Sequence, residues 1–205
     1  MSINTWDKKT ATNKNINISW ILDCIMYNST AYAKHYNMPN PKGIVIHSSL
    51  MPRPYLRWYV KPGSKNQNKQ EILEKIGYNN KMNDYNHTHR DHNFHYWIGK
   101  DQYNQVMVIK TMPTNMQSWN TDRYIHICIC EDKKDDVNYL RDCMTQTLLL
   151  CEQLCKEYNW DENQVHYYSE WKGLDDFKYW FENFGYSQEY FRKMLKRKFD
   201  KKEIL

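Results

Sequence analysis

The sequence predicts a single α/β domain in which helices flank a β-sheet. Residues 43–49 (GIVIHSS) are a short, nearly continuous apolar run, which is the pattern of a strand buried on both faces. In residues 124–130 (YIHICIC) isoleucines alternate with other side chains, as expected for a strand with two different faces. Residues 137–158 repeat apolar side chains at helical spacing. We expect the two strands to pair and the helix to pack across their sheet.

Length and composition fit one folded domain. The chain has 205 residues, of which 40% are hydrophobic, and its 17 tyrosines and 8 tryptophans can fill a packed core. Disorder over most of the chain is therefore not expected. We divide the chain into an N-terminal extension (1–27), a main domain (28–198) and a C-terminal tail (199–205). The net charge of +5 suits an anionic surface such as a cell wall, nucleic acid or an acidic protein, without choosing among them.

The first half of the chain alternates polar segments with short apolar ones. Residues 18–27 (ISWILDCIMY) form an apolar element whose type the pattern leaves open. His47 stands at the carboxyl end of the strand in residues 43–49, where α/β sheets usually place their chemistry. Residues 61–90 are a polar surface excursion with a helix over residues 69–76, and long loops of this kind often border sites.

The second half begins with a hairpin and continues into the long helix. Residues 94–99 and 105–110 are strand-like runs separated by KDQYN, a sequence typical of a hairpin loop. Asp135 and Asp136 are start signals for the helix over 137–158. Residues 164–168 are a further short strand.

The last predicted helix covers residues 187–199 and is capped by Ser187. Its Phe191, Met194, Leu195 and Phe199 are expected to point inward. The remaining face is basic and consists of Arg192, Lys193, Lys196, Arg197 and Lys198. We interpret it as a solvated face, because charge rows on helices usually are, and we do not expect nucleic acid as a partner.

The sequence also lacks the signals of a secreted, a membrane or a nucleotide-binding protein. The N-terminus lacks a basic start followed by an apolar segment, and no stretch reaches the roughly 18 apolar residues of a membrane helix. We expect a protein made in the cytoplasm without a signal peptide and without a membrane partner. Its six cysteines should then be free thiols. The sequence contains neither a glycine-rich phosphate loop nor a CxxC metal motif. It therefore gives no support to nucleotide chemistry or to a metal site of the CxxC type.

Residues 40–48 (NPKGIVIHS) resemble the opening strand of phage-type N-acetylmuramoyl-L-alanine amidases, a family that includes the peptidoglycan recognition proteins. The resemblance spans roughly residues 28–198, which we therefore describe as an amidase-like domain. It continues in chain order through LRWYVKP (56–62), HYWIGK (95–100), MPTNMQSW (112–119), ICED (129–132), LCEQLCKEY (150–158), SE (169–170) and DFKYWF (176–181).

This resemblance implies a mixed central sheet flanked by helices and a zinc-dependent hydrolysis. The bond cleaved in the family joins N-acetylmuramic acid to the L-alanine of the stem peptide. Two histidines and an aspartate or cysteine hold Zn²⁺ and leave one position open, while a nearby carboxylate moves the proton.

The family's site residues carry over to this chain only in part. His47 matches the first zinc ligand and Asp176 the third. Tyr168 stands where the second histidine is expected, and a phenol with a pKa of about 10 is a poor zinc ligand. Cys128 occupies the place of the catalytic glutamate, whose work a thiol does not do. These replacements favour a pseudoenzyme.

An alternative keeps zinc in a rebuilt centre. His47 and Asp176 would then be joined by His126 or His166 and by Cys128, since imidazole, carboxylate and thiolate all bind zinc. The substrate groove is expected to be bordered by His95, Trp119, Asn120 and Tyr168. The loop histidines His87, His89 and His92 are interpreted as solvated or hydrogen-bonded rather than as metal ligands.

Three functions follow from these predictions. The first is an amidase-fold protein, catalytically impaired or inactive, that binds a peptidoglycan fragment or a protein of a phage or its host. The second is an active zinc amidase or endolysin with a rebuilt site, and the third is an interaction protein that inhibits a host enzyme or occupies a structural place in a virion. We expect access to the cell wall only after lysis, or as part of a virion.

Overall fold

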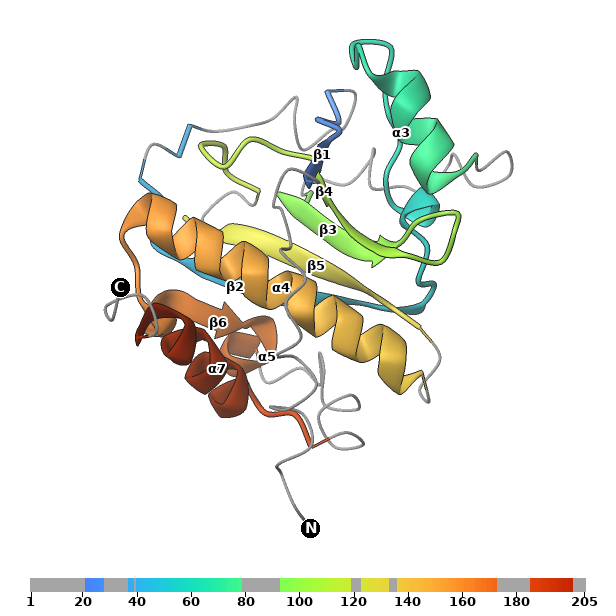
Figure 1. Ribbon diagram of the computed structural model, residues 1–205. Helices are drawn as coiled ribbons and strands as arrows, with labels where there is room; N and C mark the ends of the chain where they lie inside the picture. Colours follow the sequence, from blue (N-terminus) through green and yellow to red (C-terminus); the bar gives the residue numbers. More distant parts are fainter. Residues whose placement is uncertain are drawn as a thin grey trace.

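The computed structural model describes residues 21–27, 37–38, 40–78, 93–118, 123–132, 136–172 and 185–200. Within these residues one six-stranded sheet has the strand order β1-β4-β3-β5-β2-β6 (Figure 1). Its strands are β1 (Ile21–Asp23), β2 (Ile44–Pro52), β3 (Tyr96–Lys100), β4 (Val106–Lys110), β5 (Ile125–Glu131) and β6 (Val165–Tyr167). The helices are α3 (Lys69–Ile76), α4 (Val137–Tyr158), α5 (Tyr168–Lys172) and α7 (Gln188–Asp200), with short 3₁₀ turns η1 (Leu56–Trp58) and η3 (Glu162–Gln164).

The sheet is mixed, as the family resemblance implied. β2 pairs in parallel with both β5 and β6, and β5 continues in parallel to β3. β3 and β4 form the predicted antiparallel hairpin, and β1 adds in parallel to β4. The carboxyl ends of β2, β3 and β5 therefore lie along one edge of the sheet.

Alternating side chains divide the strands between two hydrophobic clusters. Ile44, Ile46 and Ile127 belong to the cluster that contains the buried stripe of α4 and the inner face of α7. The other cluster contains Trp97 and Cys128, together with buried residues of η1 and α3. Figure 1 shows α4 lying across the strands of one face, with α7 beside β6 and α3 at the far end of the sheet. Burial of each large side chain stabilises the fold by about 1.5–3 kcal/mol.

The described part of the N-terminal segment packs on the sheet. Within residues 21–27, which we assign to the extension, β1 extends the sheet beside β4, and Cys24 and Met26 are fully buried. The physical reason is the unpaired outer side of β4, which offers hydrogen bonds to an apolar segment with no other place to pack. The Cys24 N–H donates to the Lys110 carbonyl (2.8 Å) and the Met26 N–H to that of Thr111 (3.0 Å). At the other end α7 reaches Asp200, two residues into the expected tail.

All six cysteines are free thiols, as the sequence predicts, and the structure shows that all six are buried. Burial raises the pKa of Cys24 and of Cys155 to about 12, and neighbouring acidic groups add to the effect. Burial also raises the pKa of Cys130, Cys143 and Cys151. Thiols in this state are unreactive.

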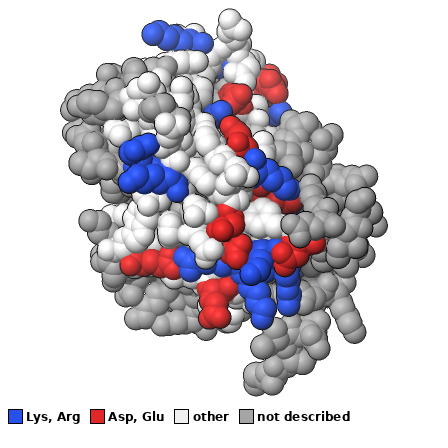
Figure 2. Space-filling model, turned by 90° about the vertical axis from the view of Figure 1, so that its left-hand side faces the viewer, with Lys and Arg blue, Asp and Glu red and all other residues white. Residues whose placement is uncertain are grey.

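The basic face of α7 is paired with acidic groups in several places. Lys196 Nζ lies 3.7 Å from Glu162, and Lys198 Nζ lies 3.9 Å from Glu152. Arg192 departs from the expected solvated role, because its guanidinium binds the carboxylate of Glu170. On the face shown in Figure 2, lysines and arginines lie beside aspartates and glutamates and form no continuous basic patch among the described residues. No described helix combines the length and the apolar composition that crossing a bilayer would require.

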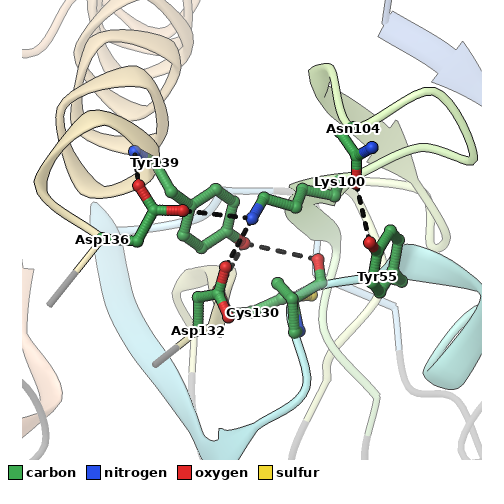
Figure 3. Close-up of polar contacts among 8 residues, drawn as sticks. Tyr55, Lys100, Asn104, Cys130, Asp132, Asp136 and Tyr139 are labelled. Atoms are coloured by element: carbon green, nitrogen blue, oxygen red, sulfur yellow. Dashed lines mark hydrogen bonds and ion pairs between the residues drawn. The ribbon is translucent and has the colours of Figure 1, made fainter. Parts of the chain in front are cut away.

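A polar cluster joins the carboxyl edge of the sheet to the start of α4 (Figure 3). Lys100, at the end of β3, binds Asp132 and lies 3.3 Å from Asp136, with its Nζ 4.5 Å from the centre of the Tyr139 ring. The Tyr139 hydroxyl donates to the Cys130 carbonyl (2.6 Å). Asp136 caps the helix by accepting the Tyr139 N–H at 2.9 Å. The ends of β3 and β5 are thereby fixed to the first turn of α4.

A substitution at Gly43, just before β2, can test how closely the chain approaches Gln164, just before β6. A Cβ at this position would stand 2.4 Å from the Gln164 carbonyl oxygen, so the backbone must move. We expect Gly43→Ala to lower the free energy of unfolding by about 1–3 kcal/mol. Urea denaturation measures the change, with the exposed Lys193→Ala on α7 as a control that should stay within about 0.5 kcal/mol of the parent. Equal stability of both variants would contradict the close approach.

Asp136 predicts part of the acid sensitivity of the fold. The Tyr139 N–H that it accepts, together with Lys100, holds the pKa of this carboxyl below its usual value, against the opposing effect of burial. Its stabilisation is therefore present above the unfolded pKa of about 3.9 and is lost as the pH falls through the folded pKa. Asp136→Asn keeps a capping oxygen but not the charge. We expect the stability difference between parent and variant, from urea melts at several pH values, to shrink in acid; a constant difference would contradict the assignment.

Candidate functional site

The candidate site lies on the sheet face opposite α4. In the parallel pairing of β2 with β5, Val45 stands beside His126 and His47 beside Cys128. Side chains alternate along a strand, and paired positions in neighbouring strands share a face. His47, His126 and Cys128 therefore point to the same side, whereas the isoleucines between them point to α4.

His47 and His126 are joined directly. The distance from His47 Nε2 to His126 Nδ1 is 2.7 Å, and the ring centroids are 5.0 Å apart. Their exposed fractions are 3% and 1%, so both rings are shielded from solvent. At this distance one ring donates an N–H hydrogen bond to the nitrogen of the other ring. The pair is a buried imidazole–imidazole hydrogen bond.

Aromatic rings enclose the His47 ring. Tyr168, the first residue of α5, lies with its ring centroid 4.6 Å away at an interplanar angle of 33°. Phe94, just before β3, meets His47 with its centroid at 4.9 Å and an angle of 64°. Tyr168 thus occupies the predicted place beside His47, and it contacts the imidazole as a packing ring. Phe94 was not among the predicted site residues; its position next to the quoted HYWIGK segment is the signal that could have indicated it.

His95 is fully buried and holds the backbone around His126. Its Nδ1 accepts the backbone N–H of His126 at 2.9 Å, so the proton is on Nε2, which donates to the Met116 carbonyl at 2.8 Å. Both ring nitrogens therefore serve backbone groups. This gives His95 a positioning role in the structure, and the substrate contact predicted for it remains a prediction.

Cys128 is fully buried in the cluster that contains η1 and α3. Its register neighbours are His47 on β2 and Trp97 on β3. The thiol is thus beside the histidine pair, as predicted, but at a position with no exposed surface. A carboxylate would be the group able to move a proton here, and no carboxylate stands at this position.

His166 has different neighbours from His47. It lies on β6, where it pairs with Val45, and its Nδ1 is 3.9 Å from Glu170. Its ring packs with Tyr124 and Trp171 at centroid distances of 5.8 and 5.3 Å. Burial lowers the pKa of His166, and the nearby Glu170 carboxylate opposes this effect. Among the described residues, no contact supports the alternative in which His166 completes the zinc centre.

The histidine pair does not have zinc geometry as it stands. Two nitrogens bound tetrahedrally at about 2.0–2.1 Å from zinc are roughly 3.3 Å apart, whereas those of His47 and His126 are 2.7 Å apart. Among the described residues, no group of three or more His, Cys, Asp or Glu side chains could hold a metal ion. Asp176, Trp119 and Asn120 lie outside the described residues, and so do the loop histidines.

A serine and glutamate group at the carboxyl edge was not predicted. Ser48 donates its hydroxyl to the carboxylate of Glu131 and accepts the Leu50 N–H at 3.0 Å. The Glu131 N–H donates to Ser49 Oγ at 2.9 Å. These bonds replace the regular ladder where the β2–β5 register shifts, and they hold Leu50 in a left-handed conformation (φ 55°). The group fixes the irregular carboxyl end of the β2–β5 pair.

Comparisons with known proteins agree on the fold. The family model described as N-acetylmuramoyl-L-alanine amidase matches residues 37–175. Solved structures similar to this chain include PlyL, with a TM-score of 0.54, 18% identity and coverage of 86% of this chain and 96% of that one. The PlyG catalytic domain has a TM-score of 0.56, 18% identity and coverage of 86% and 93%.

A third similar structure is the Staphylococcus aureus hydrolase AmiA in complex with its ligand. It has a TM-score of 0.60 and 16% identity, and the match covers 95% of this chain and 90% of AmiA. No curated protein sequence matches the chain. At these identities the solved structures show a shared fold, while the family model spans about two thirds of the chain.

Proposed function

Since this chain belongs to the N-acetylmuramoyl-L-alanine amidase family, we propose that it binds a muropeptide and does not carry out the family's zinc-dependent hydrolysis at the usual rate. Membership and fold support peptidoglycan as the target. The altered side chains around His47 support a function by binding.

The hydrogen bond between His47 and His126 is the observation that carries this proposal. It engages one of the two ring nitrogens of His47, the residue that matches the family's first zinc ligand. Tyr168 stacks on the same imidazole where the family has its second histidine. A tyrosine becomes a zinc ligand only after losing a proton of pKa about 10. The position therefore supports packing around His47 more than metal binding.

The replacement of the proton-transfer group supports the same proposal. Cys128 stands at the place of the family's glutamate and is enclosed in the core. General acid–base catalysis needs a group whose pKa lies near the working pH and which reaches the reacting atoms. The Cys128 thiol, enclosed in the core, does not meet the condition of reach.

Two other functions remain distinct alternatives. An active zinc amidase would require the histidine rings to separate and Asp176 to join them, with Cys128 as a further ligand. An interaction protein would use the scaffold's surface to bind a phage or host protein in place of peptidoglycan. In each case wall access would come through lysis or from a virion.

Binding and hydrolysis are separated by one experiment on purified sacculi. We expect the protein to sediment with sacculi but to release stem peptides at least about 10³-fold more slowly than an intact family member, because it lacks the usual carboxylate and ligand set. His47→Ala is the control: release that this change abolishes would establish the zinc enzyme instead. Failure to sediment, together with capture of a host protein, would favour the interaction protein.

The residue assignments at this site can be tested by rebuilding it. In the double variant Tyr168→His, Cys128→Glu we expect zinc binding to increase, since an imidazole is restored beside His47, and weak hydrolysis to follow from the restored carboxylate. Zinc content after purification without chelator is the measurement. Adding Asp176→Ala to the double variant should remove the gained zinc. A double variant that holds no more zinc than the parent would contradict these assignments.

A further inference from the structure

A group of three aromatic side chains near the histidine pair has no role in the site described so far. Tyr124 precedes β5, His166 lies on β6 and Trp171 lies on α5. Tyr124 and Trp171 meet edge to face at 4.6 Å, and His166 packs against both. We refer to these three residues as the aromatic cluster.

The aromatic cluster is open to solvent on one side. Trp171 is 39% exposed, whereas most large aromatic residues of the strands, such as Trp97 and Tyr167, are buried. The His166 side chain is 27% exposed. A tryptophan held partly in water beside a functional site is a common element of ligand recognition, since its ring is large and rigid.

The polar atoms of the aromatic cluster are available for a ligand. Within the described part of the chain, neither the Tyr124 hydroxyl, nor the His166 ring, nor the Trp171 indole makes a hydrogen bond. The cluster therefore combines apolar ring surface with both donors and acceptors. Binding pockets have this composition: mostly apolar walls with a few polar groups.

The short helix α5, which carries Trp171, is fixed by an ion pair between Glu170 and Arg192 of α7. Both oxygens of Glu170 bind the Arg192 guanidinium on α7, at 2.5 and 2.6 Å. Arg192 also donates to the Val165 carbonyl (2.9 Å), and Glu170 accepts the Tyr167 N–H (2.9 Å). These bonds tie α5 to β6 and α7. Trp171 is thus held in position before any ligand arrives.

The aromatic cluster is adjacent to the histidine pair. His166 pairs with Val45, which precedes His47 by two residues on the same face of β2. From strand geometry, the Cα atoms of His166 and His47 are roughly 8 Å apart. This spacing places the aromatic cluster beside the enclosed histidine pair, on the same face of the sheet.

We propose that Tyr124, His166 and Trp171 form a subsite for the sugar ring of the muropeptide. A pyranose presents C–H groups on its ring face, which stack on an aromatic surface, while its hydroxyl and N-acetyl groups need hydrogen-bond partners. The aromatic cluster supplies both, whereas an apolar peptide side chain would leave its donors and acceptors unused. This inference rests on the proposed function, because it names the part of the muropeptide held beside His47.

The test compares a sugar-containing with a sugar-free ligand. The probes are N-acetylmuramoyl-L-alanyl-D-isoglutamine and L-alanyl-D-isoglutamine, titrated into the full chain by NMR or calorimetry. We expect Trp171→Ala to weaken binding of the first about tenfold, equal to about 1.4 kcal/mol, and to leave binding of the second unchanged. Trp171→Phe should lose less, and His166→Leu, which keeps the bulk but not the ring nitrogens, should weaken only the sugar ligand. Tyr103→Ala, which removes an exposed aromatic ring elsewhere, is the matched control.

The outcomes separate this inference from the proposed function. If the parent binds both probes and Trp171→Ala and His166→Leu bind the sugar-containing probe as tightly as the parent, the subsite is wrong and muropeptide binding stands. Equal weakening of both probes in these variants would assign the aromatic cluster to the peptide and overturn the sugar subsite. A parent that binds neither probe would overturn both proposals. Circular dichroism and thermal melts show whether each variant is folded, and His166→Leu decides if Trp171→Ala is not.

Discussion

The parallel pairing of β2 with β5 is the constraint on which the rest of the molecule depends. The Ile125 N–H donates to the Gly43 carbonyl at 2.9 Å, and the Lys42 N–H to the Arg123 carbonyl at 2.7 Å, so the register is set where both strands begin. A slip of one residue would turn every side chain of a strand to the other face. The isoleucines would then leave the core under α4, and His47 would enter it. The hydrophobic core therefore fixes the orientation of the site.

The histidine pair shows how buried imidazoles are held in place on one face of the sheet. Burying an imidazole is costly unless its polar atoms are bonded. The bond between His47 Nε2 and His126 Nδ1 meets this requirement for one nitrogen of each ring, and His95 supports the backbone of His126 from the next strand. Aromatic rings then close the space around His47. The result is a closely packed group of rings around His47.

Much of the fold can be predicted from local sequence pattern. The features that could not be predicted, the type of β1 and the partner of His47, depend on contacts between residues far apart in the sequence. The long helix was predicted from its strong periodicity, the strand around His47 from its nearly continuous apolar run, and the hairpin from two strand-like runs around a loop sequence. The type of the segment that forms β1 was left open, because three residues cannot show a period and only distant β4 decides it. The partner of His47 was offered as either His126 or His166. Both face the same side by alternation, and only the tertiary packing of Trp171 and Tyr124 separates them.

The six buried cysteines give the folded chain a property of a different kind. In the native state their thiols lie inside the two clusters, and burial raises the pKa of Cys24, Cys130 and Cys143, so alkylating reagents and oxidants find little thiolate to attack. Modification then requires the surrounding structure to open. Because the thiols are spread over β5, α4 and the segment after β1, each labels a different part of the molecule. The order in which the thiols are labelled therefore records the order in which the parts of the structure unfold.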